Sequence, residues 1–375
     1  MMRTLLVLVL LSACSIRDRE QTTILDATVT LSATTGYDAE LAALDGQIRT
    51  HLRRAVDKPA DWMVPATLAD LYMAHGRLTG SYKDYDRAQV HIDTAFALAP
   101  AGSGPFLSRA GLHYTMHRLD SVEADLDRFS QRIRFTDAER ARLALMRANL
   151  AAQRGDLDAA IAGAHRALRL DDSPGGRTSL AMMLRSRGEW DAAEALLDEA
   201  AARYHGKAKE PLAWLTLHKG IFDLDRGRYD EALAHYRDAG EILDGWWLID
   251  EHIAEILTLQ GDLDAAEALY GDIVVRTGKP EFMDALAGIA ATRGATDQAT
   301  QWHDRAHEIF EAQMQRYPEA AAGHALGHFL EDGPDEAART LQLARSNATL
   351  RPNREALALL ARAQAGAASI EQPVR

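Results

Sequence analysis

The amino-acid sequence predicts an all-α solenoid, in which helical hairpins stack side by side along one axis. A phrase of fifteen residues recurs five times between residues 154 and 307, as in RGDLDAAIAGAHRAL and RGEWDAAEALLDEAA. Its second position is a glycine, and these glycines lie 33, 39, 34 and 33 residues apart: Gly155, Gly188, Gly227, Gly261 and Gly294. Such a period is typical of stacked helical hairpins. Hydrophobic residues make up 47% of the chain but aromatic residues only 6%, which indicates alanine-rich helix packing rather than a sheet core.

Small residues recur on both sides of each turn glycine. One set lies seven residues before the glycines: Ala148, Ala181, Gly220, Ala254 and Ala287. A second set lies five residues after them: Ala160, Ala193, Ala232, Ala266 and Ala299. Small side chains at both places let two helices approach closely, as ridges-into-grooves packing requires. We therefore expect each glycine to end a helix in the left-handed conformation, and an aspartate three residues later to serve the amino end of the next helix.

The spacing of these positions resembles the tetratricopeptide repeat, a helix–turn–helix unit of about 34 residues. The resemblance covers roughly Asp61 to Gln364, with degenerate copies on both sides of the five clear ones. In one degenerate copy Gly76 takes the place of the turn glycine and residues 77–83 form an insertion; in the next, His117 replaces the glycine. The resemblance implies a right-handed α-solenoid of about seven to eight hairpins over residues 57–366.

Additional helices are predicted to cap both ends of the array. Apolar residues at helical spacing mark a leading helix over residues 38–56, and a final helix is expected over residues 354–364. Residues 367–375 are expected to form a flexible tail.

The first residues resemble the signal peptide of a bacterial lipoprotein. A short basic start, Met1 to Arg3, precedes an apolar run over residues 4–11 and the sequence Leu-Ser-Ala-Cys, which ends at Cys14, the only cysteine. The resemblance implies that residues 1–13 are removed and Cys14 is lipidated, and Ser15 implies an outer-membrane, periplasm-facing location. The alternative is an ordinary secretory signal. Residues 14–37 are expected to form a tether, with a strand over residues 24–32 as the alternative.

The charge and the motifs exclude several classes of function. The net charge of −13 argues against nucleic-acid binding, which needs clustered cations. The sequence contains no phosphate loop, nucleophile elbow, HExxH string or EF-hand loop. A single cysteine allows no disulfide and no thiolate metal site. We therefore expect no enzymatic activity and no cofactor.

Three histidine pairs with a spacing of four residues give an alternative. These pairs are His113/His117, His303/His307 and His324/His328. This spacing puts both rings on one helix face, where they could share a metal ion with a third ligand such as Asp304 or Glu331. The simpler interpretation is that these histidines pack in the core or lie on the surface, so no metal site is predicted.

The inner surface of the solenoid is the predicted binding region, since the first helices of such repeats line the concave face. Counting back from the turn glycine places an apolar stripe there: Trp214, Leu217, Ile221 and Leu224. Neighbouring units contribute the charged residues Arg185, Glu251 and Glu255. An apolar patch rimmed by charge suits a peptide or a helix. The alternative is a shift of register that would make this stripe part of the core.

These observations predict a membrane-anchored scaffold that binds protein or peptide partners in the periplasm, as an assembly factor or adaptor for envelope complexes. Two other hypotheses remain. The paired histidines could make the chain a metal-binding or catalytic protein, or the stacked hairpins could continue through their ends as a self-assembling solenoid.

Overall fold

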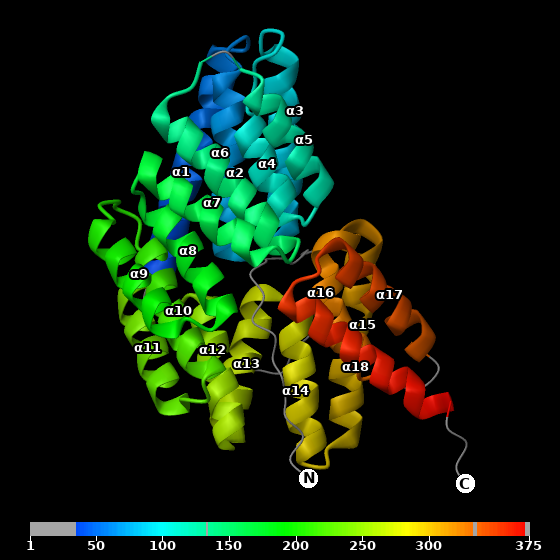
Figure 1. Ribbon diagram of the computed structural model, residues 1–375. Coiled ribbons are helices and arrows are strands. Elements are labelled where there is room, and N and C mark those ends of the chain that lie inside the picture. The colour runs from blue at the N-terminus through cyan, green and yellow to red at the C-terminus, as the bar shows by residue number, and fades with distance from the viewer. Residues whose placement is uncertain (1–34, 133, 333–335, 372–375) are drawn as a thin grey trace. The chain divides into compact units, whose positions relative to one another are not determined.

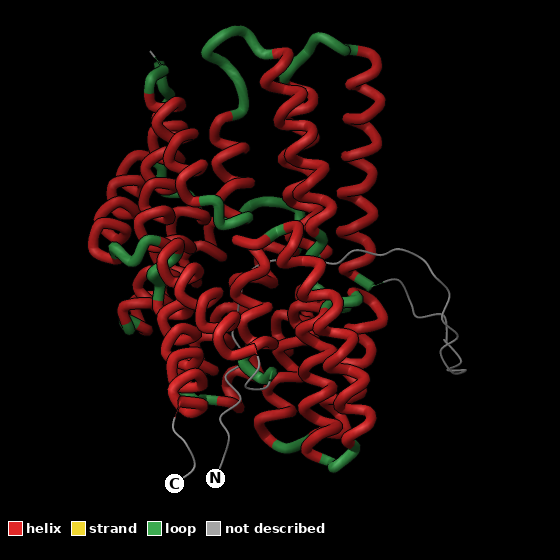
Figure 2. The backbone as a smooth tube through the Cα atoms, turned by 90° about the vertical axis from the view of Figure 1, so that its right-hand side faces the viewer, coloured by secondary structure: helices red, strands yellow, loops and turns green. Residues whose placement is uncertain are grey.

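The computed structural model describes residues 35–132, 134–332 and 336–371, and the regular elements in these ranges are α-helices (Figure 2). The lipidation site, the signal peptide and nearly all of the predicted tether lie outside the described residues. The helices follow one another along the chain (Figure 1): α1 (Gly36–Asp57), α2 (Met63–Thr79), α3 (Tyr82–Leu98), α4 (Phe106–Thr115), α5 (Leu119–Ser130), α6 (Asp137–Gln153), α7 (Leu157–Leu170), α8 (Pro174–Arg187), α9 (Trp190–Arg203), α10 (Glu210–Asp225), α11 (Tyr229–Ile242), α12 (Trp247–Gln260), α13 (Leu263–Thr277), α14 (Pro280–Thr292), α15 (Thr296–Arg316), α16 (Pro318–Phe329), α17 (Ala337–Leu350) and α18 (Arg354–Glu371). Among these helices, none combines the length and the apolar character needed to cross a bilayer.

The helices from α2 to α17 pair in sequence as eight consecutive hairpins, with α1 and α18 at the two ends of the described chain. This arrangement confirms the predicted all-α repeat solenoid. The helices divide into two compact units: one holds α4–α9 with α14–α18, and the other holds α1–α3 with α10–α13. The final helix continues to Glu371, so the predicted flexible tail is wrong for residues 367–371.

The five turn glycines all adopt the left-handed conformation that the repeat predicts, with φ between 72° and 86°. His117 is the one non-glycine residue with a positive φ among the described residues, at 56°, which confirms that it replaces a turn glycine. The predicted insertion after Gly76 is wrong. Gly76 lies inside α2, and the turn is made four residues later by Gly80, whose φ is 75°. The side chains of Asp156 and Asp262 cap the helices that follow their turns, and the predicted aspartates lie in the first helical turn.

Small residues pack the two helices of each hairpin closely together. Ala160, Ala193, Ala232 and Ala266 are fully buried, whereas Ala299 is only partly buried. At Gly220 a Cβ atom would lie 2.4 Å from the Tyr236 ring, so a larger residue would push α10 away from α11. The small residue at this position is therefore a steric requirement of the hairpin.

Two neighbouring tryptophans join α12 to α2 within one unit. Both are buried, and both donate their indole N–H to the carbonyl of Leu78, over 3.2 Å for Trp246 and 3.0 Å for Trp247. Gly80 and the buried Lys279 pack against Trp247, with the Lys279 ammonium 4.6 Å from the ring. In a simple solenoid each repeat contacts only its neighbours, so this tie between distant segments is a departure from that pattern.

A second tie lies in the other unit, between the α4–α5 turn and the α17–α18 turn. Arg351 is buried and donates to His117 Nε2 over 2.7 Å and to the side-chain oxygen of Asn347 over 3.1 Å. Burial, with the charges of Arg351 and His324, lowers the pKa of His117 to about 3. The imidazole is therefore neutral, which it must be to accept a hydrogen bond from a guanidinium.

Candidate functional site

The predicted apolar stripe on α10 does not form an exposed surface. Leu217 and Ile221 are buried, and Trp214 and Leu224 are partly buried. The expected wet face is therefore wrong for the two central residues. The cause is not a shift of register, because Gly220 meets Tyr236 as the repeat requires. Instead, α10 is buried around most of its circumference, and α1 lies beside its start, where the Lys209 backbone N–H donates to Glu40 over 2.8 Å.

The charged residues predicted for the same surface lie in different settings. Glu255 is buried, 3.2 Å from His252 Nδ1, so it is not available to a partner at the surface. Glu251 and Arg185 are partly exposed on α12 and α8. Their role in binding stays a prediction.

Asp223 stands at a position that the repeat normally fills with an apolar side chain. It is buried and accepts hydrogen bonds from Arg226 over 3.2 Å and from Arg228, with His235 Nδ1 2.8 Å from its second oxygen. A carboxylate with cationic partners around it can be buried at this position because its oxygens are satisfied.

A groove beside α6 and α7 is a candidate binding surface that the sequence reasoning missed. Its apolar lining includes Phe135, Leu143 and Ala144. Three arginines also line it, namely Arg140, Arg147 and Arg166. Arg147 pairs with Asp127 over 2.9 Å and Arg140 pairs with Asp137, and both pairs lie at the solvent-exposed surface, where such contacts exchange readily. Apolar and cationic side chains along one groove together suit an acidic amphipathic segment.

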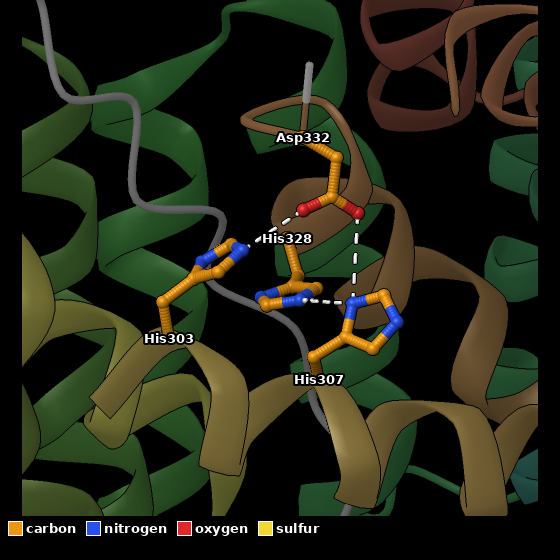
Figure 3. A group of neighbouring side chains, drawn as sticks. All are labelled: His303, His307, His328 and Asp332. Atoms are coloured by element: carbon orange, nitrogen blue, oxygen red, sulfur yellow. Dashed lines mark hydrogen bonds and ion pairs between the residues drawn. The ribbon is translucent and has the colours of Figure 1, made fainter. Parts of the chain in front are cut away.

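Three histidines and one aspartate meet at the junction of α15 and α16 (Figure 3). His303 and His307 project from successive turns of α15, His328 comes from the end of α16, and Asp332 follows that helix. His303 Nε2 lies 2.9 Å from Asp332 Oδ1, and His307 Nδ1 lies 3.1 Å from His328 Nε2 and 3.6 Å from Asp332 Oδ2. One ligand atom from each of the four residues falls within 4.8 Å of all the others.

The surroundings of this histidine cluster hold His328 in one orientation. Its side chain is fully buried, and its Nδ1 lies 2.9 Å and 3.1 Å from the two oxygens of Asp284. The rings of His303 and His328 stack with their centroids 4.4 Å apart, and the Phe310 ring packs against the His328 ring with their centroids 5.0 Å apart. Burial raises the pKa of the Asp284 carboxyl, and this effect is larger than the opposite effect of the hydrogen bond from His328.

The sequence singled out His303, His307 and His328 but combined them wrongly. It paired His328 with His324 on the same helix, whereas the fold places His328 against the histidines of α15. The carboxylate is Asp332 rather than Asp304, which is exposed, or Glu331, which pairs with Arg362 over 3.2 Å. The pair His113/His117 does not form a cluster of this kind: His113 faces Asp125 at 3.3 Å and His117 accepts from Arg351.

Comparisons with known proteins match one hairpin of the chain to a known repeat. The family model described as tetratricopeptide repeat matches residues 177–205, which correspond to α8 and α9. No curated protein sequence matches the chain. Among solved structures, Cut9–Hcn1 of the APC/C hetero-tetramer is 12% identical with a TM-score of 0.54, covering 88% of this chain and 62% of that one. This likeness shows the fold alone.

Two smaller solved structures are also similar. One is YrrB, described as a TPR protein with an unusual peptide-binding site, at 17% identity and a TM-score of 0.33, covering 44% of this chain and 84% of that one. The other is pilF of Pseudomonas aeruginosa, at 16% identity and a TM-score of 0.41, covering 63% of this chain and 93% of that one.

Proposed function

Because this chain is a tetratricopeptide-repeat protein, with the fold of protein-interaction scaffolds, we propose that it is a non-enzymatic scaffold anchored in the bacterial envelope. Stacked hairpins create extended surfaces that bind partner segments rather than enclosed sites for small molecules. The proposed role is that of an assembly factor or adaptor, which holds one protein of an envelope complex near another.

The groove of α6 and α7 is the observation that carries this proposal. Phe135 and Leu143 give a partner apolar side chains to cover, and Arg140, Arg147 and Arg166 give it cations to pair with. Arg140 and Arg147 pair with aspartates only at the exposed surface, so an acidic partner can compete for them. We therefore propose that the partner segment is acidic and amphipathic, and that it docks along this groove.

Reversing two of these charges tests the proposed docking. The double variant Arg140→Glu/Arg166→Glu is expected to reduce the amount of cross-linked partner on the order of tenfold, since each reversal costs about 0.7 kcal/mol at an exposed position and the two together cost about 1.4 kcal/mol. The full-length protein, cross-linked in its host and extracted in detergent, is compared with the variant by mass spectrometry. The cross-linked peptides are expected to be rich in Asp and Glu beside Leu and Phe.

Arg142→Glu is the control, because Arg142 is exposed on α6 and does not line the groove. It changes the net charge in the same direction and is expected to retain the partner. If the double variant captures as much partner as the wild type does, the groove is not the docking surface. If Arg142→Glu also loses the partner, the loss comes from the change in net charge and not from the groove.

The proposed anchor is a lipid on Cys14, supported by the apolar run and the small-residue sequence that precede it. Cys14→Ser is expected to remove the acyl mass of the intact protein and to move the protein from the membrane fraction to the soluble fraction. Ser15→Asp is the companion variant. It is expected to keep the lipid but shift the protein from the outer to the inner membrane on a density gradient. A wild-type protein without added acyl mass would contradict the anchor.

A further inference from the structure

The histidine cluster of His303, His307, His328 and Asp332 has the dimensions of a four-ligand metal site. Ligand atoms at 2.0–2.1 Å from a tetrahedral Zn²⁺ lie about 3.4 Å from one another. The pairs in the cluster lie 2.9, 3.1 and 3.6 Å apart, and all four ligand atoms fall within 4.8 Å. Shifts on the order of 1 Å would bring these atoms around one ion.

His328 is already oriented as a ligand. Its Nδ1–H donates to Asp284, so the proton is held on that nitrogen and the lone pair of Nε2 points at the cluster. A carboxylate behind a buried histidine is the arrangement that fixes the tautomer and orientation of metal-binding imidazoles. The side chain is fully buried, so it cannot turn toward water instead.

Without a cation, one carboxylate oxygen of the cluster has no hydrogen bond. Since the Asp284 contact fixes the lone pair on His328 Nε2, its contact with His307 Nδ1 can be a hydrogen bond only when His307 carries a proton there. Within the described part of the chain, Asp332 Oδ2 is buried without a hydrogen bond, and His307 Nδ1 lies 3.6 Å from it. A bound cation would take the place of this proton, accept the lone pairs of both imidazoles and satisfy the carboxylate oxygen.

We propose that His303, His307, His328 and Asp332 bind one Zn²⁺ ion, which fastens the end of α16 to α15. Imidazole nitrogens with one carboxylate are ligands that suit Zn²⁺, and the same set also accepts Cu²⁺ and Ni²⁺. Four protein ligands fill a tetrahedral shell and leave no position for a reacting water, so the ion stabilises the junction of α15 and α16 rather than performing chemistry. This site goes beyond the scaffold function and does not depend on it.

Metal binding by the full-length protein tests the proposal. The protein is prepared without a histidine tag, stripped with chelator, equilibrated with Zn²⁺ and dialysed, and its metal content is measured by mass spectrometry. One equivalent of zinc is expected, together with a rise in the thermal unfolding midpoint. In parallel, Co²⁺ is expected to give the intense visible absorption of a four-coordinate site. Background zinc, or only the weak bands of six-coordinate cobalt, would overturn the proposal.

Variants separate the four ligands from other histidines. His303→Ala and Asp332→Asn are each expected to abolish stoichiometric binding, and Asp284→Asn, behind His328, is expected to weaken it 10- to 100-fold. His324→Ala and the exposed His165→Ala are the controls and are expected to bind one equivalent. Circular dichroism checks that each variant is folded. Full binding by the ligand variants, or loss of binding in a folded control, would show that these four side chains do not form the site.

Discussion

Replacing Trp246 by alanine is expected to lower the free energy of unfolding of the unit that contains α2 and α12 by about 3–5 kcal/mol. The indole is buried to 1% exposure, and its N–H reaches the carbonyl of Leu78. Alanine would leave a cavity the size of two fused rings where the two segments of this unit meet. Urea unfolding followed by far-ultraviolet circular dichroism measures the change as a shift of the transition that belongs to this unit.

Trp246→Phe gives a graded comparison. Phenylalanine keeps most of the buried volume but removes the donor, and Trp247 still donates to the same carbonyl. The expected cost is therefore only about 1 kcal/mol for the lost hydrogen bond, with a smaller addition for packing. If Trp246→Ala costs no more than Trp246→Phe, the ring does not hold the two segments together.

Acidification is expected to destabilise the unit that contains His117 more steeply than the same unit of a His117→Asn variant. A histidine in the unfolded chain binds its proton near pH 6.5, whereas burial and Arg351 lower the pKa of folded His117 to about 3. Between these values the unfolded state binds more protons, so stability falls as the pH falls, by about 1.4 kcal/mol for each pH unit. Above pH 6.5 both states are neutral and this contribution is constant.

Asparagine is the informative replacement at this position because it tolerates the left-handed conformation, and its side-chain oxygen can accept from Arg351 as the imidazole does. Urea unfolding at intervals between pH 7 and pH 4 gives the two slopes, and their difference isolates His117 from the other titrating groups. His165→Asn, at an exposed position on α7, is expected to keep the wild-type slope. Parallel curves for the wild type and His117→Asn would contradict the prediction.

Much of the fold could be predicted because each helix and turn of the repeat depends on residues close together in the sequence. A turn that needs the left-handed conformation strongly favours glycine, so five glycines at equivalent places in the repeat locate five turns. His117 could be recognised because the pattern on both sides of it predicts a turn there. Gly76 misled the sequence interpretation because a glycine also serves close packing. It lies inside α2, where a Cβ atom would come within 2.9 Å of Tyr85.

The candidate sites were harder to predict because they depend on which helices meet. Helical spacing shows that His303 and His307 share a face, but it does not show that His328 lies against that face or that Asp284 stands behind it. Likewise, the repeat places Leu217 on the inner face of α10, but it cannot show that this face is covered. Contacts between elements distant in sequence carry no local signal, so they had to be seen in the structure.

The tie between Leu78 and the two indoles has a consequence for the order of events during synthesis. The ribosome releases the first hairpin long before its partner, since Trp246 follows Leu78 by 168 residues. At typical elongation rates this interval lasts roughly 10–30 s. Over that time the apolar flank of α2 has no indole to cover it, and closing so long a loop is slow. The amino-terminal hairpin therefore stays without its indole cover until a segment 168 residues further along the chain is available.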